Sequence, residues 1–300
     1  MYMSNDEELK VLKQALEQSF MIVEIDYSGK ITYVNENFCK VSKYSSEEIL
    51  LQNYWILSSG YHSQDFFEKI WETITRGKKW TGEICSRAKN REIYWVKTTI
   101  IPFKDKNKGS YRFLAILIDI TDKKKSREWM YMAFHDELTG LPNRRMLNLC
   151  YDSYILKATY KQTKFAVLFM DINNFKNIND SYGHLIGDEF LRKVGNRLSS
   201  IFSKKDCVFR FGGDEFIIII DDIRNLEKKM HSILSLFVDP FILGSYTFYA
   251  SISVGVSIYP DHSSKKDTLM NYANKAMFKS KQNHGNNYQI YQLNGGGNNE

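Results

Sequence analysis

A pair of glycines followed at once by two acids separates two apolar segments in the second half of the chain. The segments at 207–211 and 216–220 are typical of strands, and Gly212-Gly213 permits a tight turn because glycine adopts positive φ without steric cost. Asp214 and Glu215 follow directly. The pattern therefore predicts a hairpin that carries two carboxylates at its end, with no side chain on either glycine to keep a ligand from the backbone.

A third carboxylate is expected beside this hairpin. Residues 164–170 form a continuous apolar run, as expected of a strand covered on both faces, and Asp171 follows it at the sheet edge where α/β proteins bind ligands. If the strands are neighbours, Asp171 meets Asp214 and Glu215. Three carboxylates this close repel one another unless a cation lies between them.

Magnesium fits such a cluster, because it prefers carboxylate oxygens and shares its coordination shell with substrate phosphates. Two such ions can stabilise both the attacking oxygen and the leaving pyrophosphate of a phosphoryl transfer. The alternative is an ordinary hairpin whose acids face solvent. The glycine-glycine-aspartate turn alone favours that alternative, but Asp171 and the loop after it favour the metal site.

The surrounding sequence alternates helical and strand patterns from residue 136 onward, which predicts an α/β arrangement. Helices are expected at 143–161, 187–201, 223–238 and 266–281, and strands at 164–170, 207–211, 216–220 and 246–259.

The first part of the chain has a different pattern. A helix at 4–18 precedes short strands at 20–26 and 31–35, a capping box from Ser45 to Glu48, a helix at 64–76 ended by Gly77, and strands at 80–87, 92–104 and 111–121. Two strands, short helices and three antiparallel strands resemble a PAS sensor domain over residues 8–121. The stretch 79–98 and the ending Asp-Ile-Thr at 119–121 also resemble that family.

A helix without proline or glycine is expected between the two parts, at 119–135. Ile120, Arg127, Met130 and Phe134 fall near heptad spacing, so this helix could pair with its copy in a dimer as a signalling helix. The alternative is one helix packed on its own domain, and less than three heptads do not separate the two.

The composition of the chain argues against several classes of protein. Hydrophobic residues at 43% and charged residues at 25% are typical of a soluble globular protein, and apolar runs such as 216–220 fall far short of the roughly 20 residues that cross a bilayer. The polar N-terminus is no signal peptide, and four cysteines without CxxC spacing indicate a reducing cytoplasm. The net charge of +6 is spread rather than striped, which indicates no nucleic-acid groove but suits a protein that handles polyanionic nucleotides.

Four sequence blocks in the second part of the chain, in a fixed order, point to one family. They are HDELTGLPNRR (135–145), DINNFKNINDSYGHLIGDEFL (171–191), RFGGDEF (210–216) and SVGVSIYP (253–260). Together they resemble the GGDEF diguanylate cyclases, nucleotidyltransferases that condense two GTP molecules into cyclic di-GMP and two pyrophosphates with Mg²⁺ or Mn²⁺.

The two resemblances imply an α+β chain. A PAS domain with a five-stranded antiparallel sheet and helices is joined by a helix to a ferredoxin-like, palm-type GGDEF domain. The expected boundaries are 1–121 for the PAS domain with its N-terminal helix, 122–135 for the signalling linker, 136–293 for the GGDEF domain and 294–300 for a disordered tail.

The GGDEF resemblance implies a metal site. Asp171 and Asp214 would hold Mg²⁺ with the backbone carbonyl of Ile172, and Glu215 would assist in metal binding or in activating the ribose 3′-hydroxyl. Because each 3′-hydroxyl must attack the α-phosphorus of the other nucleotide, one domain supplies half of an active site. The resemblance therefore implies a homodimer.

The resemblance also implies how GTP is held. Asn179 and Asp188 would hydrogen-bond the guanine edge, since a carboxylate facing two N–H donors beside an amide reads guanine. Asp188 also favours GTP on both sides over mixed products, although it could equally be the N-cap of a helix at 188–201. The phosphates would be cradled by Phe175, Lys176, the Gly212-Gly213 backbone and Lys281.

Two positions depart from the family pattern. Ser203 stands where many relatives carry the arginine of a product-inhibition site, although Asp206 is retained. Serine cannot replace the planar arginine fork, so weak or absent product inhibition is expected. Gly285 stands where a phosphate-binding arginine is common, which would raise the GTP requirement.

The PAS resemblance leaves the sensor ligand open. Trp80-Thr81-Gly82 and Asn35 resemble flavin-binding members, which would place FAD in the domain. The alternative, ranked slightly ahead, is that Trp80 is a core aromatic residue and the pocket is empty or binds a small metabolite. Haem, with His62 as ligand, is a further hypothesis.

Two functions therefore remain. The first is a PAS-controlled diguanylate cyclase. The second is a catalytically weak GGDEF domain that acts as a GTP-sensing or interaction module. Degenerate relatives usually lose acids of the signature, and both acids are present here, which favours the enzyme.

Overall fold

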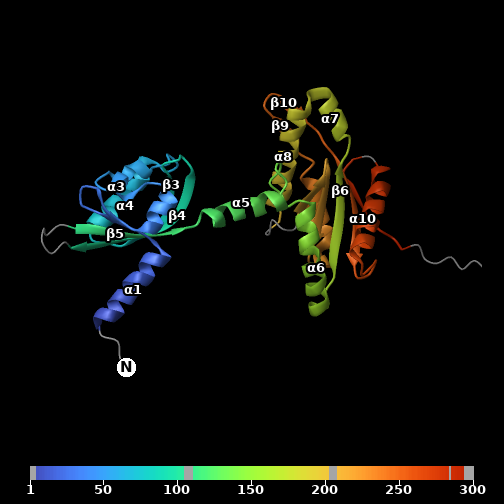
Figure 1. The fold of residues 1–300 in the computed structure, drawn as a ribbon. Coiled ribbons are helices and arrows are strands. Elements are labelled where there is room, and N and C mark those ends of the chain that lie inside the picture. The colour runs from blue at the N-terminus through green and yellow to red at the C-terminus, as the bar shows by residue number, and fades with distance from the viewer. Residues whose placement is uncertain (1–4, 105–110, 203–207, 284, 294–300) are drawn as a thin grey trace, which may run out of the picture. The chain divides into compact units, whose positions relative to one another are not determined.

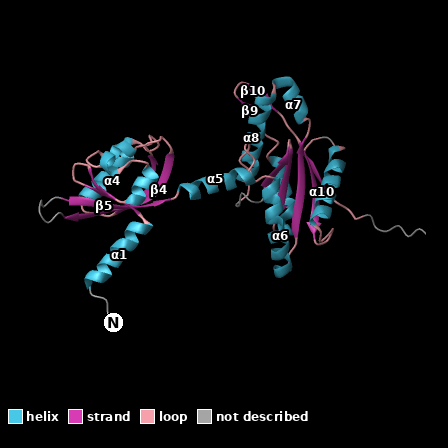
Figure 2. Ribbon diagram, viewed as in Figure 1, coloured by secondary structure: helices cyan, strands magenta, loops and turns pink. Residues whose placement is uncertain are grey.

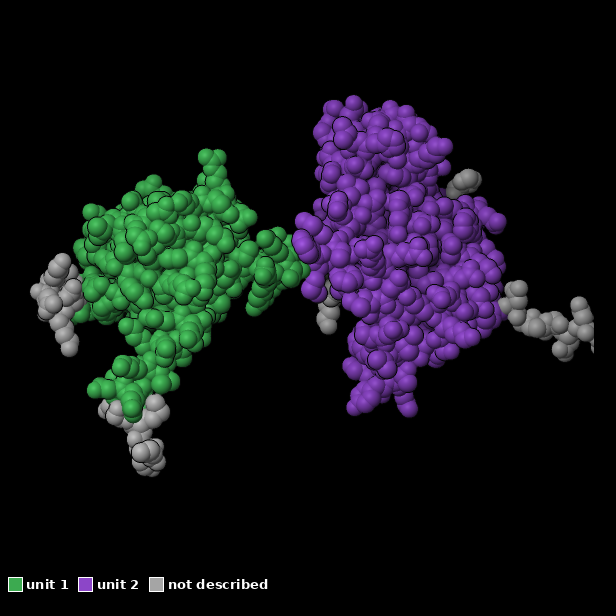
Figure 3. Space-filling view, in the orientation of Figure 1, with its two compact units in different colours: residues 1–128 green, residues 129–300 purple. Residues whose placement is uncertain are grey.

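The computed structural model describes residues 5–104, 111–202, 208–283 and 285–293 of the chain. The chain divides into two compact units, Met1–Glu128 and Trp129–Glu300 (Figure 3). Each has its own hydrophobic core.

Unit 1 contains a five-stranded antiparallel sheet in the order β2-β1-β5-β4-β3. The strands are β1 (Met21–Ile25), β2 (Ile31–Val34), β3 (Trp80–Arg87), β4 (Ile93–Lys104) and β5 (Tyr111–Asp119). Buried residues alternate with more exposed ones along β4 and β5, because one face of the sheet is covered and the other is not. The predicted five-stranded antiparallel sheet is confirmed.

Short helices cover the inner face of this sheet (Figures 1 and 2). They are α2 (Glu36–Ser42), α3 (Ser46–Ile49), the 3₁₀ turn η1 (Tyr54–Leu57) and α4 (Gln64–Thr75), with α1 (Asn5–Ser19) before the sheet. Ile49, Leu57 and Ile70 from these elements pack on strand residues such as Val96. The predicted capping box is present, with reciprocal bonds between Ser45 and Glu48.

The helix expected between the two parts is α5 (Thr121–Phe134). None of its residues is buried. At its first turn Lys124 forms an ion pair with Glu83 of β3, with 2.6 Å between Nζ and Oε2. At its end the Tyr131 ring stacks on His135, with 4.0 Å between the ring centroids.

Unit 2 is built on a five-stranded sheet in the order β12-β11-β6-β8-β7. Its strands are β6 (Phe165–Ile172), β7 (Val208–Gly212), β8 (Glu215–Ile220), β11 (Ile252–Tyr259) and β12 (Asn287–Ile290). Neighbours run antiparallel except β11 and β12, which are parallel. Every residue of β6 is buried, which confirms the prediction of a strand covered on both faces.

Helices cover both faces of this sheet (Figure 1). Alternate β6 residues such as Leu168 pack on α8 (His184–Ser200) and α9 (Leu226–Ser235), and the intervening residues pack on α6 (Arg144–Lys161) and α10 (Lys266–Lys281). A further helix, α7 (Phe175–Tyr182), follows β6, and the 3₁₀ turn η3 (Ile223–Asn225) precedes α9.

One predicted strand was wrong. The pattern at 246–259 predicted a single strand, whereas the chain forms β10 (Tyr246–Phe248) and then β11. The first piece pairs with β9 (Phe241–Leu243) in a separate two-stranded hairpin, with Gly244 at positive φ in the turn. The elements β9, β12 and α7 were not predicted.

Candidate active site

The two carboxylate-bearing strands are neighbours, as expected. In the antiparallel pairing of β6 and β8, Asp171 lies directly opposite Glu215. Strand β7 ends at Gly212, which pairs with Glu215 on the other edge of β8, and Gly213 and Asp214 form the turn between the two strands. Asp171, Asp214 and Glu215 therefore meet at one end of the sheet.

Asp171 is the most enclosed of these acids, with only 7% of the residue exposed. Burial raises the pKa of its carboxyl, an effect that the Lys281 ammonium opposes and the nearby Asp214 carboxylate reinforces. Burial likewise raises the pKa of Glu215, and the charges on Asp171 and Asp214 add to the effect. The three groups thus form one cluster of mutually repelling negative charge.

Lys281 is held against this cluster. Its Nζ lies 2.8 Å from Oδ1 of Asp171. Gly255 of β11 makes the placement possible, because a Cβ there would lie 2.0 Å from the carbonyl oxygen of Ala273 and 2.1 Å from the amide nitrogen of Met277. The missing side chain lets α10 pack directly on the sheet, and Lys281 is the last residue of α10.

The glycine turn is open on its outer side. A Cβ at Gly212 or Gly213 would meet no atom within 4 Å, and Gly213 has a φ of 50°. Arg210 holds the turn in place by donating from Nε and Nη2 to the Gly213 carbonyl at 3.0 and 2.8 Å. The backbone of the turn is therefore fixed and accessible.

The same arginine connects the turn to the start of unit 2. Arg210 Nη1 donates to Oδ1 of Asp136 at 2.8 Å, and that oxygen also accepts from the backbone and hydroxyl of Thr139. Burial acts to raise the pKa of Asp136, but the bonds from Thr139 and Arg210 outweigh it and lower the pKa. Asp136 and Arg210 stand in two of the sequence blocks, yet the sequence reasoning gave them no role.

Arg144 is a second residue that the sequence reasoning missed. It is the first residue of α6, and its guanidinium lies over the Phe211 ring, 4.6 Å from the centroid. Its positive charge acts to lower the pKa of Glu215, against the neighbouring carboxylates. Its position in the sequence block at 135–145 was a signal that could have drawn attention to Arg144.

The two expected guanine readers lie on successive helices, Asn179 on α7 and Asp188 on α8, and both are half-buried. A Cβ on Gly187 would lie 1.9 Å from Oδ1 of Asn179, so Gly187 lets the amide come close to α8 beside Asp188. The alternative that Asp188 caps its helix was wrong. Helix α8 begins at His184 with Gly183 as N-cap, since the chain turns at Gly183 with a φ of 84°.

The expected phosphate residues on α7 differ from each other. The Phe175 side chain is buried against Phe190, with 6.1 Å between ring centroids, so only its backbone can face a ligand. Lys176 is exposed. Both lie in the first turn of α7, which begins three residues after Ile172, the last residue of the strand that carries Asp171.

The donor set suits a hard cation. Asp171, Asp214 and the Ile172 carbonyl offer oxygen atoms only, which Mg²⁺ prefers. Within the described residues, no three His, Cys, Asp or Glu side chains are grouped closely enough to hold a metal by themselves. Mg²⁺ commonly takes one or two carboxylates and completes its shell with water and substrate phosphates, so these residues fit the ion.

The residues expected to contact a PAS ligand are engaged elsewhere. Asn35 is 5% exposed; its Oδ1 accepts from the backbone N–H of Ile22 and Phe38, and its Nδ2 donates to carbonyls at the end of α1. Trp80 is half-buried and packs on the core of unit 1. Neither residue is among those that line the two cavities found in unit 1, and these contacts give FAD no support.

The haem hypothesis also lacks support. Nε2 of His62 accepts a hydrogen bond from the Cys85 backbone at 2.9 Å, and the ring stacks on Phe66 with 4.1 Å between centroids. That nitrogen is therefore engaged by the chain. The product-inhibition residues Ser203 and Asp206, and the tail at 294–300, lie outside the described residues.

Comparison with known families identifies the second unit. A family model described as diguanylate cyclase, GGDEF domain, matches residues 133–287, more than half of the chain. The chain belongs to the GGDEF family. A PAS domain model matches residues 17–122 of this GGDEF protein. Both predicted families are confirmed.

Among curated relatives, the bifunctional diguanylate cyclase/cyclic di-GMP phosphodiesterase MucR of Pseudomonas aeruginosa is 34% identical over 174 residues, covering 56% of this chain and 25% of MucR. The cyclic di-GMP phosphodiesterase PdeR of Escherichia coli is 35% identical over 167 residues, covering 55% of this chain and 25% of PdeR. This GGDEF protein thus spans about a quarter of the length of either relative.

Among solved structures, the GGDEF domain of TpbB (YfiN) from Pseudomonas aeruginosa matches with a TM-score of 0.51 and 30% identity, over 53% of this chain and 95% of that chain. The predicted GGDEF fold is confirmed. Within the described residues, no helix combines the length and apolar character that crossing a bilayer requires.

Proposed function

We propose that this GGDEF protein is a diguanylate cyclase that condenses two GTP molecules into cyclic di-GMP and two pyrophosphates under control of its PAS domain. The observation that carries the proposal is the pairing of Asp171 with Glu215 at the end of the sheet, beside the open Gly212-Gly213 turn. Carboxylates, exposed backbone and a lysine occupy one small region. That combination suits a nucleoside triphosphate with its cation.

Bound Mg²⁺ or Mn²⁺ would neutralise phosphate charge and stabilise the oxygens that gain charge during transfer. Asp171, Asp214 and the Ile172 carbonyl would hold it. Glu215 would accept the proton of the ribose 3′-hydroxyl, which attacks the α-phosphorus of the other GTP while the bond to the bridging oxygen breaks and pyrophosphate leaves. Most of the remaining rate enhancement would come from positioning the two nucleotides and from neutralising their charge.

The triphosphate would lie along the Gly212-Gly213 backbone and the first turn of α7, near Phe175 and Lys176. Lys281 would move from Asp171 to the terminal phosphates once a cation neutralises that carboxylate. Asn179 and Asp188 would hydrogen-bond the guanine edge, which excludes adenine because its edge presents a different donor and acceptor pattern.

Two copies must meet for both bonds to form, so the active species would be a homodimer with one GTP on each GGDEF domain. Residues 1–121 would be the PAS sensor, 122–135 the signalling linker and 136–293 the cyclase domain. We place the reaction in the cytoplasm, and propose no nucleic-acid partner. The absence of an arginine at Ser203 supports weak product inhibition, and Gly285 supports an elevated GTP requirement.

The rival function is a GTP-sensing or interaction module without turnover. Asp171, Asp214 and Glu215 are all present and converge, which supports the enzyme. Titrating the purified protein with GTP and Mg²⁺ by calorimetry, alongside a turnover assay, separates the two. Binding without cyclic di-GMP supports the sensing module, whereas turnover that Asp214→Ala abolishes in a folded variant supports the cyclase. Turnover retained by Asp214→Ala would contradict the metal assignment.

A further inference from the structure

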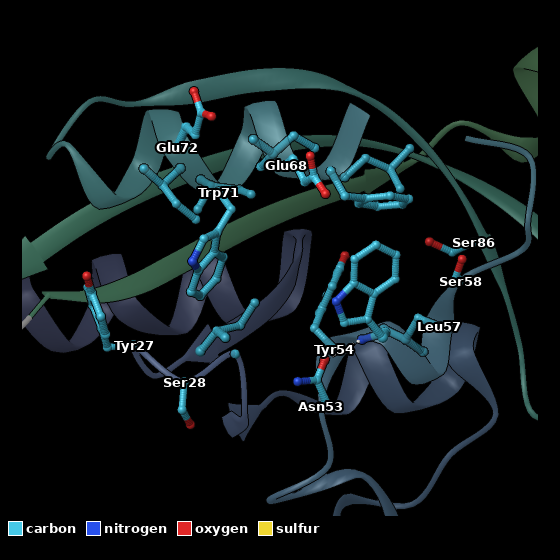
Figure 4. Close-up of a pocket in the computed structure, with 18 of the residues that line it drawn as sticks. Tyr27, Ser28, Asn53, Tyr54, Leu57, Ser58, Glu68, Trp71, Glu72 and Ser86 are labelled. Carbon is cyan, nitrogen blue, oxygen red and sulfur yellow. Dashed lines mark hydrogen bonds between the residues drawn. The ribbon is translucent and has the colours of Figure 1, made fainter. Parts of the chain in front are cut away.

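Unit 1 contains a cavity of about 520 Å³ between its sheet and the helices over it (Figure 4). Residues from β1, β3 and β4 form its floor, and residues from η1 and α4 form its walls. A cavity of this size holds a small organic molecule, since ligand pockets commonly measure roughly 300–1,000 Å³.

Aromatic side chains border the cavity and remain open to solvent. Trp55 is 51% exposed and Trp71 is 36% exposed, although both rings line the cavity. Each is fixed by a neighbouring ring: the Trp55 centroid lies 4.7 Å from that of Phe67, and the Trp71 centroid 5.3 Å from that of Phe113. Figure 4 shows Trp71 directed from α4 into the cavity. Exposed apolar surface gathered at a cavity in this way is typical of a ligand-binding groove.

The charged side chains that line the cavity are all acidic. Among the described lining residues, the charged ones are Glu68 and Glu72, one turn apart on α4. Glu72 is paired with Arg76, with 3.7 Å between Oε2 and Nη2, and in Figure 4 its carboxylate is directed away from the cavity. The Glu68 carboxylate lies nearer the cavity, accepts from the Gln64 amide at 2.8 Å, and has no ion-pair partner among the described residues.

We propose that this cavity binds a small organic monocation with an apolar body. Its ammonium group would lie at Glu68 with the indole faces of Trp55 and Trp71 beside it, because aromatic faces attract cations. Its apolar body would contact the branched side chains of the floor, such as Ile84 and Ile100. A carboxylate or phosphate ligand is disfavoured, since the described lining offers no basic side chain.

Three probes with one carbon skeleton isolate the charge: 4-phenylbutylammonium, 4-phenylbutan-1-ol and 4-phenylbutanoate. Binding to the full chain is measured by calorimetry and by tryptophan fluorescence, which a phenyl ring does not disturb. We expect the ammonium to bind about fivefold more tightly than the alcohol. The carboxylate should bind more weakly than the alcohol.

Two variants test the assignment. Glu68→Gln should reduce the preference for the ammonium over the alcohol to less than about twofold, with the alcohol's affinity unchanged. Glu47→Gln, on α3 and outside the cavity lining, is the matched control and should keep the full preference. Trp71→Phe should weaken ammonium binding more than alcohol binding and remove part of the fluorescence response.

Equal affinity of the ammonium and the alcohol for the wild-type chain would overturn the proposal. So would a preference that survives in Glu68→Gln, or no binding of any of the three probes to a chain shown to be folded by circular dichroism. These measurements use no GTP, so their failure leaves the cyclase assignment untouched, and failure of the cyclase assignment leaves the cavity proposal standing.

Discussion

Lys281 Nζ lies 2.8 Å from Oδ1 of Asp171, and this pair connects the end of α10 to the carboxylate cluster of the sheet. Without a bound cation, the lysine is the charge that offsets a 7% exposed carboxylate. In the proposed mechanism, binding of GTP with its metal would free the same ammonium for a phosphate. Lys281 would then have two partners in succession, Asp171 and the terminal phosphates.

Replacing this lysine tests both roles. Lys281→Met should raise the KM for GTP about tenfold, equivalent to about 1.4 kcal/mol of lost binding, with a smaller change in kcat. The free energy of unfolding of the nucleotide-free protein should fall by about 1–2 kcal/mol, because the Asp171 carboxylate remains buried without the lysine ammonium that pairs with it. Lys279→Met, in the same last turn but exposed, is the control for steady-state kinetics and urea unfolding. An unchanged KM in Lys281→Met would contradict the assignment.

A substitution at Gly187 tests the two guanine-reading residues, Asn179 and Asp188, without replacing either of them. In Gly187→Ala the new Cβ would lie 1.9 Å from Oδ1 of Asn179, so the amide must move. We expect a stability loss of about 1–3 kcal/mol and a clear rise in the KM for GTP, although alanine alone favours a helix by about 1 kcal/mol.

Gly195→Ala, in the same helix, is the matched control for that substitution. Its Cβ would lie 3.2 Å from Cβ of Thr139, away from Asn179. It should change thermal stability but leave the KM for GTP unaltered. Equal KM values for the two variants would show that Gly187 does not position the guanine reader.

Glu215 lies in a site whose charges repel in the absence of a cation. Burial and then the charges of Asp171 and Asp214 raise the pKa of its carboxyl, so its ionised form is disfavoured in the folded state. Glu215→Gln should stabilise the metal-free, nucleotide-free protein by about 0.5–1 kcal/mol at neutral pH while cyclase activity falls sharply. Thermal unfolding with a chelator present checks it; a destabilised variant would speak against mutual repulsion at this site.

Asp136 should give stability a recognisable pH dependence. Its pKa is lowered in the folded state, so its contribution is present above the unfolded value near 3.8 and is lost as pH falls through the folded value. Asp136→Asn should cost about 1–2 kcal/mol at pH 7, and the difference from wild type should shrink below about pH 4. Urea unfolding at both pH values measures it, with exposed Asp152→Asn as control. A difference that stays constant with pH would rule out the charged pair.

Much of the fold could be predicted from local pattern. Strands β6 and β8 are continuous apolar runs because helices cover both faces, and the Gly-Gly turn forces β7 and β8 to be neighbours. The split at 249–251 could not be predicted, because β10 pairs with β9, a three-residue strand whose partner is decided by tertiary contacts.

The site was partly predictable for the same reason. Convergence of Asp171 with Glu215 followed from strand adjacency. Other contacts depend on how separate elements pack in three dimensions. They are the Arg210–Asp136 pair, the close approach of Gly187 to Asn179, and the hydrogen bonds between Asn35 and backbone groups. Such contacts leave no periodic signal in the chain.

The most direct test of the cyclase assignment is product formation as a function of protein concentration. The purified chain is incubated with GTP and Mg²⁺, and the products are separated by chromatography and identified by mass. The two-site account predicts cyclic di-GMP and pyrophosphate, with specific activity that rises with protein concentration until the dimer is saturated. No cyclic di-GMP at any concentration of folded protein would contradict it.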